Sequence, residues 1–145
     1  DFTNMCKLEK KKDPMRTIDE CIPWLAPNGR VIGISVRSRA FLWNQVRRMA
    51  SAISGVVSGR NTLDDIRVAL NSPEDPADLG RSPSDGLVLW SIENPYSDGM
   101  TDGSFPDTSW FSEPPSDMRG HTRWLALARL EMATLLEREW LKRLN

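Results

Sequence analysis

Apolar residues recur at helical spacing in the segment between residues 40 and 59. They are Leu42, Val46, Met49, Ile53 and Val57. Residues three or four positions apart share one face of a helix, so this spacing predicts a helix from Ala40 to Gly59 that buries the stripe, with Gly59 as its C-cap. Packing of that face would hold Arg47 at a fixed point.

Arg47 is the first candidate for chemistry because an arginine stays charged in a protein. A guanidinium held near a pocket is a permanent partner for an anion, either a carboxylate or a phosphate. The alternative is a surface arginine that lies along its own helix in water.

A β-hairpin is predicted before this helix. Residues 16–25 alternate loosely and indicate a strand, with Pro23 placing it at a sheet edge. Asn28-Gly29 favours a tight turn, because both residues tolerate positive φ angles, and residues 30–37 form the return strand.

The remaining elements follow in mixed order. A second helix begins at Thr62 as N-cap and turns Ile66, Ala69 and Leu70 inward. A loop follows over 72–85, and the apolar residues of 86–93 predict a strand covered on both faces. The segment 94–121 is rich in Pro, Gly, Ser and Asp and predicts a long irregular loop, pinned by Trp110 and Phe111.

Residues 122–144 predict a long amphipathic helix. Its apolar stripe is Leu125, Ala128, Met132, Leu135 and Leu136. Core packing of this stripe is the simplest interpretation, and a homodimer contact is the alternative. Mixed helices and strands with an antiparallel hairpin indicate an α+β fold.

The net charge of −1 hides an uneven distribution. Residues 1–60 carry a balance of +6 and the rest of the chain −7. The first part could therefore present a basic face to a polyanion, or Lys10, Lys11 and Lys12 could simply be a solvated loop. No apolar run is as long as a membrane span and no signal peptide opens the chain, so we expect a cytoplasmic protein without a membrane partner, although a nucleus or mitochondrion would also fit.

Few residues are available for metal or nucleophilic chemistry. Cys6 and Cys21 lie far from a C-x-x-C spacing, and His121 is the only histidine. A zinc site of four protein ligands is therefore not expected, and histidine-dependent catalysis would depend on His121 alone.

Three segments resemble, in order, motifs of the TruA family of tRNA pseudouridine synthases. The segment from Phe41 to Arg47 resembles the family's Phe-Leu-x-x-x-Val-Arg helix. Asp1-Phe-Thr-Asn-Met-Cys-Lys7 is similar to its Asp-Phe-x-Asn-Phe-Cys-Lys segment, especially in archaeal and eukaryotic members. Ser82-Pro-Ser-Asp-Gly-Leu-Val-Leu89 is similar to its Ala-Pro-Ala-x-Gly-Leu-x-Leu strand.

The resemblance implies an isomerase that converts uridine to pseudouridine in the anticodon stem-loop of tRNA, with one aspartate and no metal or cofactor. The family's Arg-(Thr/Ala)-Asp-x-Gly-Val motif is absent from the chain. Residues 1–145 are therefore expected to be the C-terminal catalytic subdomain, inactive alone, which partners a missing N-terminal half that carries the aspartate.

The resemblance also assigns roles to single residues. Arg47 would pair with the catalytic aspartate, and Leu87 and Phe41 would line the substrate pocket, Leu87 against the target base. Four basic side chains near the hairpin and the helix start are candidates for contacts with RNA phosphates, although each could instead be a solvated surface charge: Lys7, Arg37, Arg39 and Arg48. Two alternatives stay open: a non-catalytic RNA-binding or dimerisation module of the same fold, and a small-molecule enzyme in which Arg47 binds a substrate carboxylate.

Overall fold

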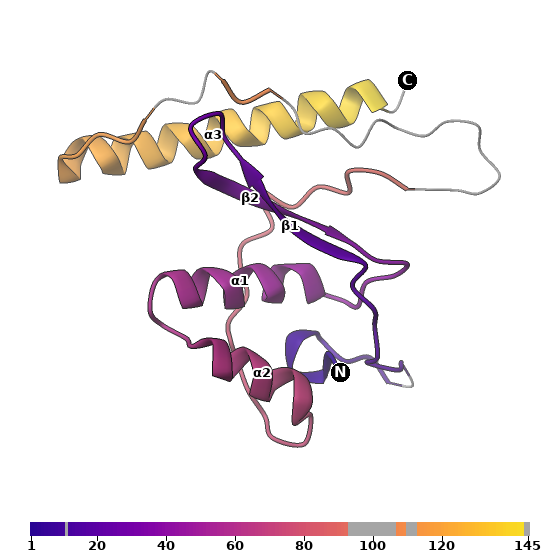
Figure 1. The fold of residues 1–145 in the computed structure, drawn as a ribbon. Helices are drawn as coiled ribbons and strands as arrows, with labels where there is room; N and C mark the ends of the chain where they lie inside the picture. The colour runs from indigo at the N-terminus through magenta and orange to yellow at the C-terminus, as the bar shows by residue number, and fades with distance from the viewer. Residues whose placement is uncertain (11, 93–106, 110–112, 144–145) are drawn as a thin grey trace. The chain divides into compact units, whose positions relative to one another are not determined.

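The fold is described from a computed structural model of the chain. The structure describes residues 1–10, 12–92, 107–109 and 113–143. The elements are a 3-10 turn η1 (Thr3–Met5), strands β1 (Glu20–Leu25) and β2 (Val31–Arg37), and helices α1 (Gln45–Val57), α2 (Leu63–Asn71) and α3 (Met118–Arg143) (Figure 1). A two-stranded antiparallel sheet with helices confirms the predicted α+β class.

The chain divides into two compact units, each of which is described by itself. The first contains Asp1–Trp24 and Val31–Ser84, and therefore η1, most of the hairpin, α1 and α2. The second contains the hairpin tip, Leu25–Arg30, and the described residues from Asp85 onward, including α3. None of the described helices has an apolar stretch long enough to cross a lipid bilayer.

The hairpin turn is where the sequence placed it. Gly29 has a φ of +81°, and the Ala26 amide donates to the Arg30 carbonyl at 2.8 Å. The first strand begins at Glu20, so the prediction of a strand from residue 16 was wrong at its start. The last backbone bond of the hairpin joins the Asp19 amide to the Arg37 carbonyl at 2.9 Å, and β2 ends at Arg37, which leaves the earlier residues no ladder partner in the described chain.

The start predicted for α1 was wrong by five residues, because the chain makes a tight turn before the helix. Asn44 has a left-handed φ of 63°, a conformation that asparagine tolerates better than most residues. The side chain of Gln45 accepts a hydrogen bond from the Leu42 amide at 2.8 Å, and the Gln45 amide donates to the Leu42 carbonyl at 3.0 Å. These bonds close the turn, and the helix begins at Gln45.

The stripe predicted for α1 is confirmed at Leu42, which is in the core, and at Met49, which packs against it, but it was wrong in the second half of the helix. Ile53 is 37% exposed and Val57 is 85% exposed, although the spacing had placed both in the core. The helix instead buries a face of small or polar residues. They are Gln45, Ser51, Ala52 and Gly55. Small side chains let neighbouring segments approach the helix closely, so burial here follows shape more than hydrophobicity.

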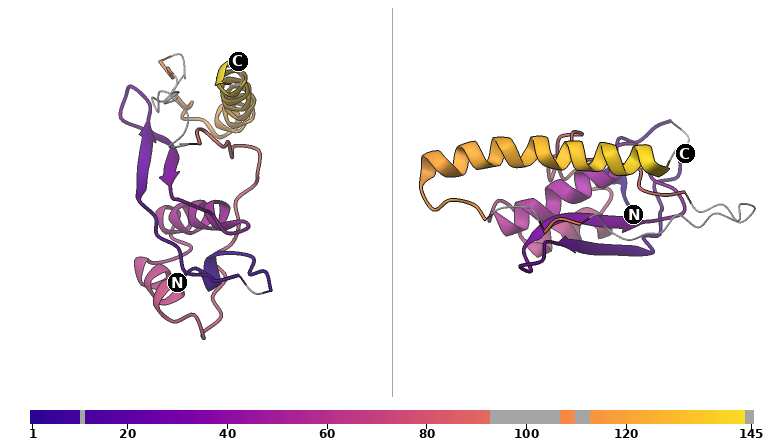
Figure 2. Two further views of the ribbon diagram at one scale, coloured as in Figure 1. Left: turned by 90° about the vertical axis from the view of Figure 1, so that its right-hand side faces the viewer. Right: turned by 90° about the horizontal axis from the view of Figure 1, so that it is seen from above.

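The core of the first unit joins segments that are distant in the sequence. Turn η1 contacts both α1 and α2, and Figure 2 shows these three elements side by side. Seven buried residues form the cluster: Phe2, Met5, Cys6, Leu42, Ala52, Ala69 and Leu79. The N-terminal segment is therefore part of the core.

The predicted start of helix α2, with Thr62 as its N-cap, is confirmed. The Thr62 side chain accepts from the Asp65 amide at 3.1 Å, and the Asp65 carboxylate accepts from the Thr62 amide at 2.6 Å, which makes a reciprocal capping box. Ala69 is buried, and Ile66 and Leu70 pack against the core as predicted.

The strand predicted over 86–93 is not observed in its described part, residues 86–92. Leu87 is 49% and Leu89 is 60% exposed, so the expected cover on both faces is also absent. A strand needs a neighbour for its amides and carbonyls, and among the described residues the one sheet is the β1–β2 pair.

The second unit is built around α3. The helix begins at Met118, four residues before the predicted start, and its described part ends at Arg143. Most of the predicted 94–121 loop, with Trp110 and Phe111, lies outside the described residues; positions 107–109 and 113–117 are neither helix nor strand. Trp124, Ala128 and Leu136 are its buried residues, so Trp124 takes the place predicted for Leu125.

The hairpin tip packs against this helix. The Arg30 guanidinium lies 4.5 Å from the ring centre of Trp124, and Asn28 donates a hydrogen bond to Glu113. The Arg30 cation over the indole face accounts for part of the burial of Trp124 in the second unit.

Candidate active site around Arg47

Arg47 lies in the first turn of α1 and is held by two neutral acceptors. Its Nε donates to the Ser82 carbonyl at 2.7 Å, and one Nη donates to the Asn44 side-chain oxygen at 3.3 Å. A backbone hydrogen bond joins the same two residues, because the Ser82 amide donates to the Arg47 carbonyl at 3.1 Å. The side chain is partly buried, so the guanidinium is neither free in bulk water nor closed off.

The loop that carries Ser82 is fixed to α1 next to this contact. The Ser51 hydroxyl donates to the Leu79 carbonyl at 3.0 Å. Gly80 has a φ of +81°, and a Cβ at this position would lie 2.6 Å from the Ser51 oxygen. Glycine is therefore required for both conformation and space, and it brings the loop close enough to reach Arg47.

Arg48 holds the same loop from its other side. Its guanidinium pairs with Asp78 at 3.0 Å, and the Gly80 amide also donates to the Asp78 carboxylate at 3.0 Å. The Gly80 hydrogen bond, followed by the charge of Arg48, lowers the pKa of Asp78. The ionised carboxylate therefore stabilises the loop.

The first segment of the chain reaches the same turn. The Lys7 amide donates to the Trp43 carbonyl at 2.8 Å, and the Lys7 ammonium lies 4.1 Å from the centre of the Trp43 ring. The three segments that carry the family resemblance thus meet between Trp43 and Arg47. The sequence did not predict this convergence, because its contacts span about 35 residues in either direction.

Asn4 is a residue that the sequence analysis missed. Its amide donates to the carbonyls of Ala69, Ser72 and Asp75 at 3.0 to 3.3 Å, and its oxygen accepts from the Ala77 amide at 3.1 Å. One side chain thus closes the loop after α2. The available signal was an asparagine in a short segment that also carries the apolar residues Phe2 and Met5.

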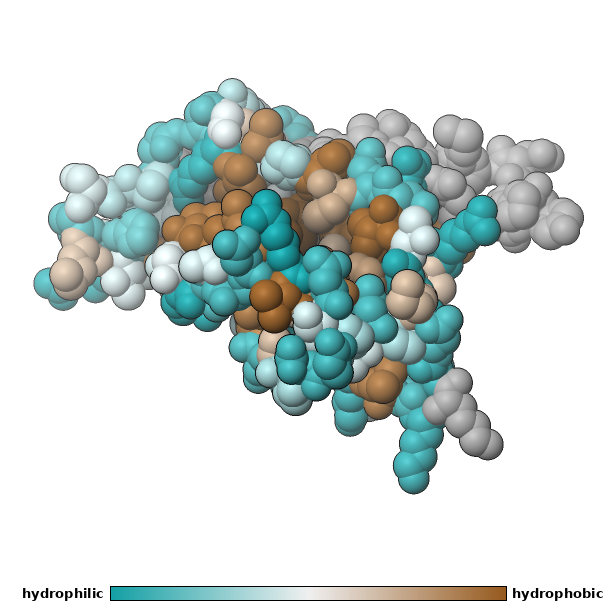
Figure 3. All heavy atoms as spheres, turned by 60° about the horizontal axis from the view of Figure 1, so that its bottom comes forward, coloured by the Kyte–Doolittle hydropathy of each residue, from teal (hydrophilic) through white to brown (hydrophobic). Residues whose placement is uncertain are grey.

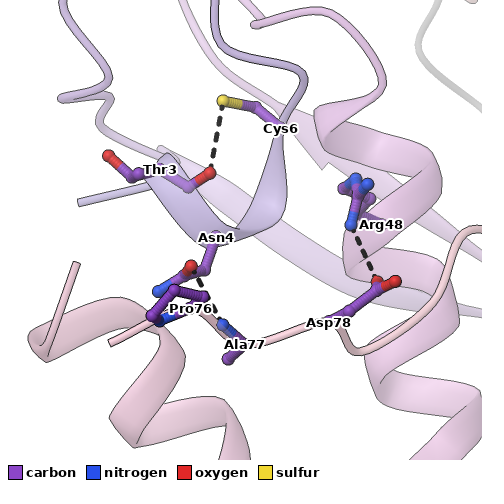
Figure 4. A pocket seen from close by; sticks show the side chains of 7 residues that line it. All are labelled: Thr3, Asn4, Cys6, Arg48, Pro76, Ala77 and Asp78. Carbon is purple, nitrogen blue, oxygen red and sulfur yellow. Dashed lines mark hydrogen bonds and ion pairs between the residues drawn. The ribbon is translucent and has the colours of Figure 1, made fainter. Parts of the chain in front are cut away.

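A polar hollow of about 320 Å³ lies between η1, α1 and this loop (Figure 4). Its lining residues are Thr3, Asn4, Cys6, Arg48, Pro76, Ala77 and Asp78. Burial raises the pKa of the Cys6 thiol, and the thiol donates to the Thr3 carbonyl at 3.8 Å. A buried thiol with a raised pKa is a poor nucleophile, so Cys6 has a packing role.

The other predicted site residues are placed as follows. Phe41, 41% exposed, comes just before the turn into α1. Arg37 is exposed at the end of β2 and Arg39 is exposed just after it, and Arg39 lines a second hollow of about 580 Å³ with Arg16 and Ser38. Leu87 belongs to the second unit and is half-exposed there.

The comparisons with known proteins concern the same part of the chain. The family profile of tRNA pseudouridine synthases matches residues 1–95. A "tRNA pseudouridine synthase A" of Methanocorpusculum labreanum is 33% identical over 91 residues, which cover 63% of this chain and 31% of the relative. One of Thermococcus kodakarensis is 33% identical over 95 residues, 66% of this chain and 34% of the relative.

A further relative has the same name and a similar degree of identity. A protein of the same name from Brucella ovis is 33% identical over 94 residues, 64% of this chain and 37% of the relative. The chain thus matches about a third of the length of these relatives, and no solved structure matches it. Because the family profile covers well over half of the chain, the chain belongs to the tRNA pseudouridine synthase family.

Proposed function

We propose that the protein to which this chain belongs isomerises uridine to pseudouridine in the anticodon stem-loop of tRNA. In this reaction the N1–C1′ bond breaks, the base turns, C5 joins C1′, the C5 proton is released to solvent, and N1 takes up a proton. The family match and the name that the relatives share support the reaction class. Arg47 would form the wall of the active site opposite a catalytic aspartate, which would come from an N-terminal half outside this chain.

The hydrogen bonding of Arg47 is the observation that carries the proposal. A guanidinium has five N–H donors, and the contacts with Ser82 and Asn44 use two of them, both with neutral acceptors. No carboxylate of the described residues forms an ion pair with Arg47. Three donors on a fixed, partly buried side chain are therefore left for an anion that this part of the chain does not supply.

A carboxylate is the anion that such a group suits best. A guanidinium can donate two parallel hydrogen bonds to one carboxylate, which fixes its orientation as well as its charge. The positive charge within about 4–6 Å would also lower the pKa of the aspartate and keep it ionised. Asn44 and Ser82 position the guanidinium for this contact.

The remaining residues act on the RNA in this proposal. Leu87 would pack against the everted base and Phe41 would line the pocket, as the resemblance implies. Lys7, Arg37 and Arg39 are exposed basic residues suited to phosphate contacts. Arg48 would have to exchange the Asp78 carboxylate for a phosphate, because the two are paired in the structure.

The test is Arg47→Lys in the whole protein, with tRNA labelled with tritium at C5 of uridine. Lysine keeps the charge and loses the planar pair of donors, so we expect a turnover lower by about 100-fold or more with a small change in tRNA affinity. Arg67→Lys is the matched control, because Arg67 is an exposed arginine of α2 paired with Asp64. Unchanged turnover of Arg47→Lys would remove the catalytic role.

The chain of 145 residues should by itself release no tritium, because it lacks the family's aspartate motif. Release by the isolated chain would show that a nucleophile lies within it. If the whole protein binds tRNA but leaves its uridines unchanged, the alternative of a non-catalytic RNA-binding module is correct. A homodimer through α3 stays a prediction.

A further inference from the structure

Trp43 is an exposed tryptophan in the turn that leads into α1. Its side chain is 54% exposed, whereas the preceding Leu42 is 6% exposed and belongs to the core. The space-filling view in Figure 3 shows that apolar side chains remain at the surface among hydrophilic ones. Tryptophan gains much from burial, so an indole left open beside a packed core is a candidate binding surface.

The backbone around Trp43 is fixed on both sides. The carbonyl of Trp43 accepts from the Lys7 amide at 2.8 Å, and the next residue, Asn44, makes the left-handed turn into α1. The Gln45 side chain holds the Leu42 amide. The indole is therefore mounted on a preformed turn, and a ligand would not have to order the backbone on binding.

Lys7 gives this surface its charge. Its ammonium lies 4.1 Å from the centre of the indole ring, and among the described residues it is the one that makes a ring contact with Trp43. Lys7 is itself exposed, so the ammonium covers one ring face and keeps its own access to water. A flat aromatic ring with a cation beside it matches a nucleobase and its neighbouring phosphate.

From this geometry we infer that Trp43 and Lys7 form a binding site for one unpaired nucleotide step of RNA. The open face of the indole stacks on a base, and the Lys7 ammonium contacts an adjacent phosphate. The positive balance of residues 1–60 favours a polyanion over an apolar protein segment as the occupant. The inference rests on the proposed function, because it takes tRNA as the ligand.

The test measures binding of an unmodified tRNA transcript to the whole protein at several salt concentrations. Trp43→Ala should weaken binding about 5- to 150-fold, the range expected for loss of one base stack, and leave the salt slope unchanged. Trp43→Phe keeps a stacking ring and should stay within a factor of about 5 of the wild type. Trp140→Ala, at an exposed tryptophan of α3, is the control and should change nothing.

The Lys7→Gln variant separates the two parts of the site. It should lower the salt slope by about 0.7 to 0.9, the contribution of one phosphate contact. Quenching of tryptophan fluorescence by the RNA should be smaller in Trp43→Phe than in the wild type. If Trp43→Ala lowers the thermal unfolding temperature, its affinity cannot be compared with that of the wild type. The salt slope of Lys7→Gln and the fluorescence quenching of Trp43→Phe then test the binding site instead.

Unchanged tRNA affinity of a folded Trp43→Ala variant would overturn the inference. If that variant instead altered the binding of another protein, the surface would be a protein contact. If Arg47→Lys loses turnover while Trp43→Ala binds normally, the stacking site fails and the proposed function stands. Failure of the wild-type protein to bind tRNA would remove both.

Discussion

Replacement of Gly80 by alanine tests how closely the loop after α2 approaches α1. The residue has a φ of +81°, and an added Cβ would lie 2.6 Å from the Ser51 oxygen. The hydroxyl would have to rotate away and give up its hydrogen bond to the Leu79 carbonyl. The left-handed conformation costs alanine about 1–2 kcal/mol, and the lost hydrogen bond adds about 0.5–1.5 kcal/mol.

We therefore expect Gly80→Ala to lower the free energy of unfolding by about 1.5–3.5 kcal/mol, the sum of these two contributions. Gly59→Ala is the matched control. Gly59 has a φ of +71°, but nothing lies within 4 Å of a Cβ added there. It should show the conformational cost of about 1–2 kcal/mol alone.

Urea unfolding of the chain, followed by circular dichroism, gives both values. The second substitution Ser51→Gly removes the clashing oxygen, so in that background Gly80→Ala should cost only as much as Gly59→Ala. Equal losses for the two glycine variants in the wild-type background would refute the close approach. In the whole protein, Gly80→Ala should also lower turnover more than tRNA affinity, because the same loop carries the Ser82 carbonyl that holds Arg47.

Two further predictions concern titratable groups. The pKa of Asp78 is lowered in the folded chain, so its ionised form stabilises the fold at pH values above the ordinary carboxyl pKa of 3.8, and this stability is lost as the pH falls below 3.8. The Asp78→Asn variant should therefore lose less stability than the wild type as the pH is lowered into this range. An equal loss in both proteins would contradict this prediction. Cys21 is exposed and Cys6 is buried, so a thiol reagent should modify one cysteine in a rapid phase, and the Cys21→Ser substitution should abolish this phase. A rapid phase that remains in the variant would show that Cys6 is accessible.

Local signals predicted some elements well. Asn28-Gly29 placed the hairpin turn, and Thr62 placed the start of α2, because each signal acts through hydrogen bonds within four residues. Neither depends on the rest of the fold. The α+β class followed from these elements together.

Other elements depended on contacts that a local pattern does not contain. Helix α1 begins at Gln45 because a buried side chain closes a turn over Leu42, and it buries Ala52 and Gly55 because other segments approach it closely. Apolar spacing selected Ile53 and Val57, the larger side chains, and missed this face. Residues 86–92 have the composition of a strand, but strand pairing needs a neighbour that the described residues do not provide.

The candidate site shows the same division. Arg47 could be singled out from the sequence because its charge is permanent and its segment resembles a family motif. The residues that hold its guanidinium could not be predicted. Ser82 lies 35 residues away in the sequence, and Asn44 makes its contact from a left-handed turn that the sequence analysis did not expect. The resemblance supplied the residues and the structure supplied their contacts.

In the proposed function, the guanidinium of Arg47 meets a catalytic carboxylate. A crystal structure of the whole protein measures this contact directly. We expect two nitrogens of Arg47 to lie about 2.7–2.9 Å from the two oxygens of one aspartate, with the Ser82 contact retained. An Arg47 more than about 6 Å from every carboxylate outside this chain would contradict the account.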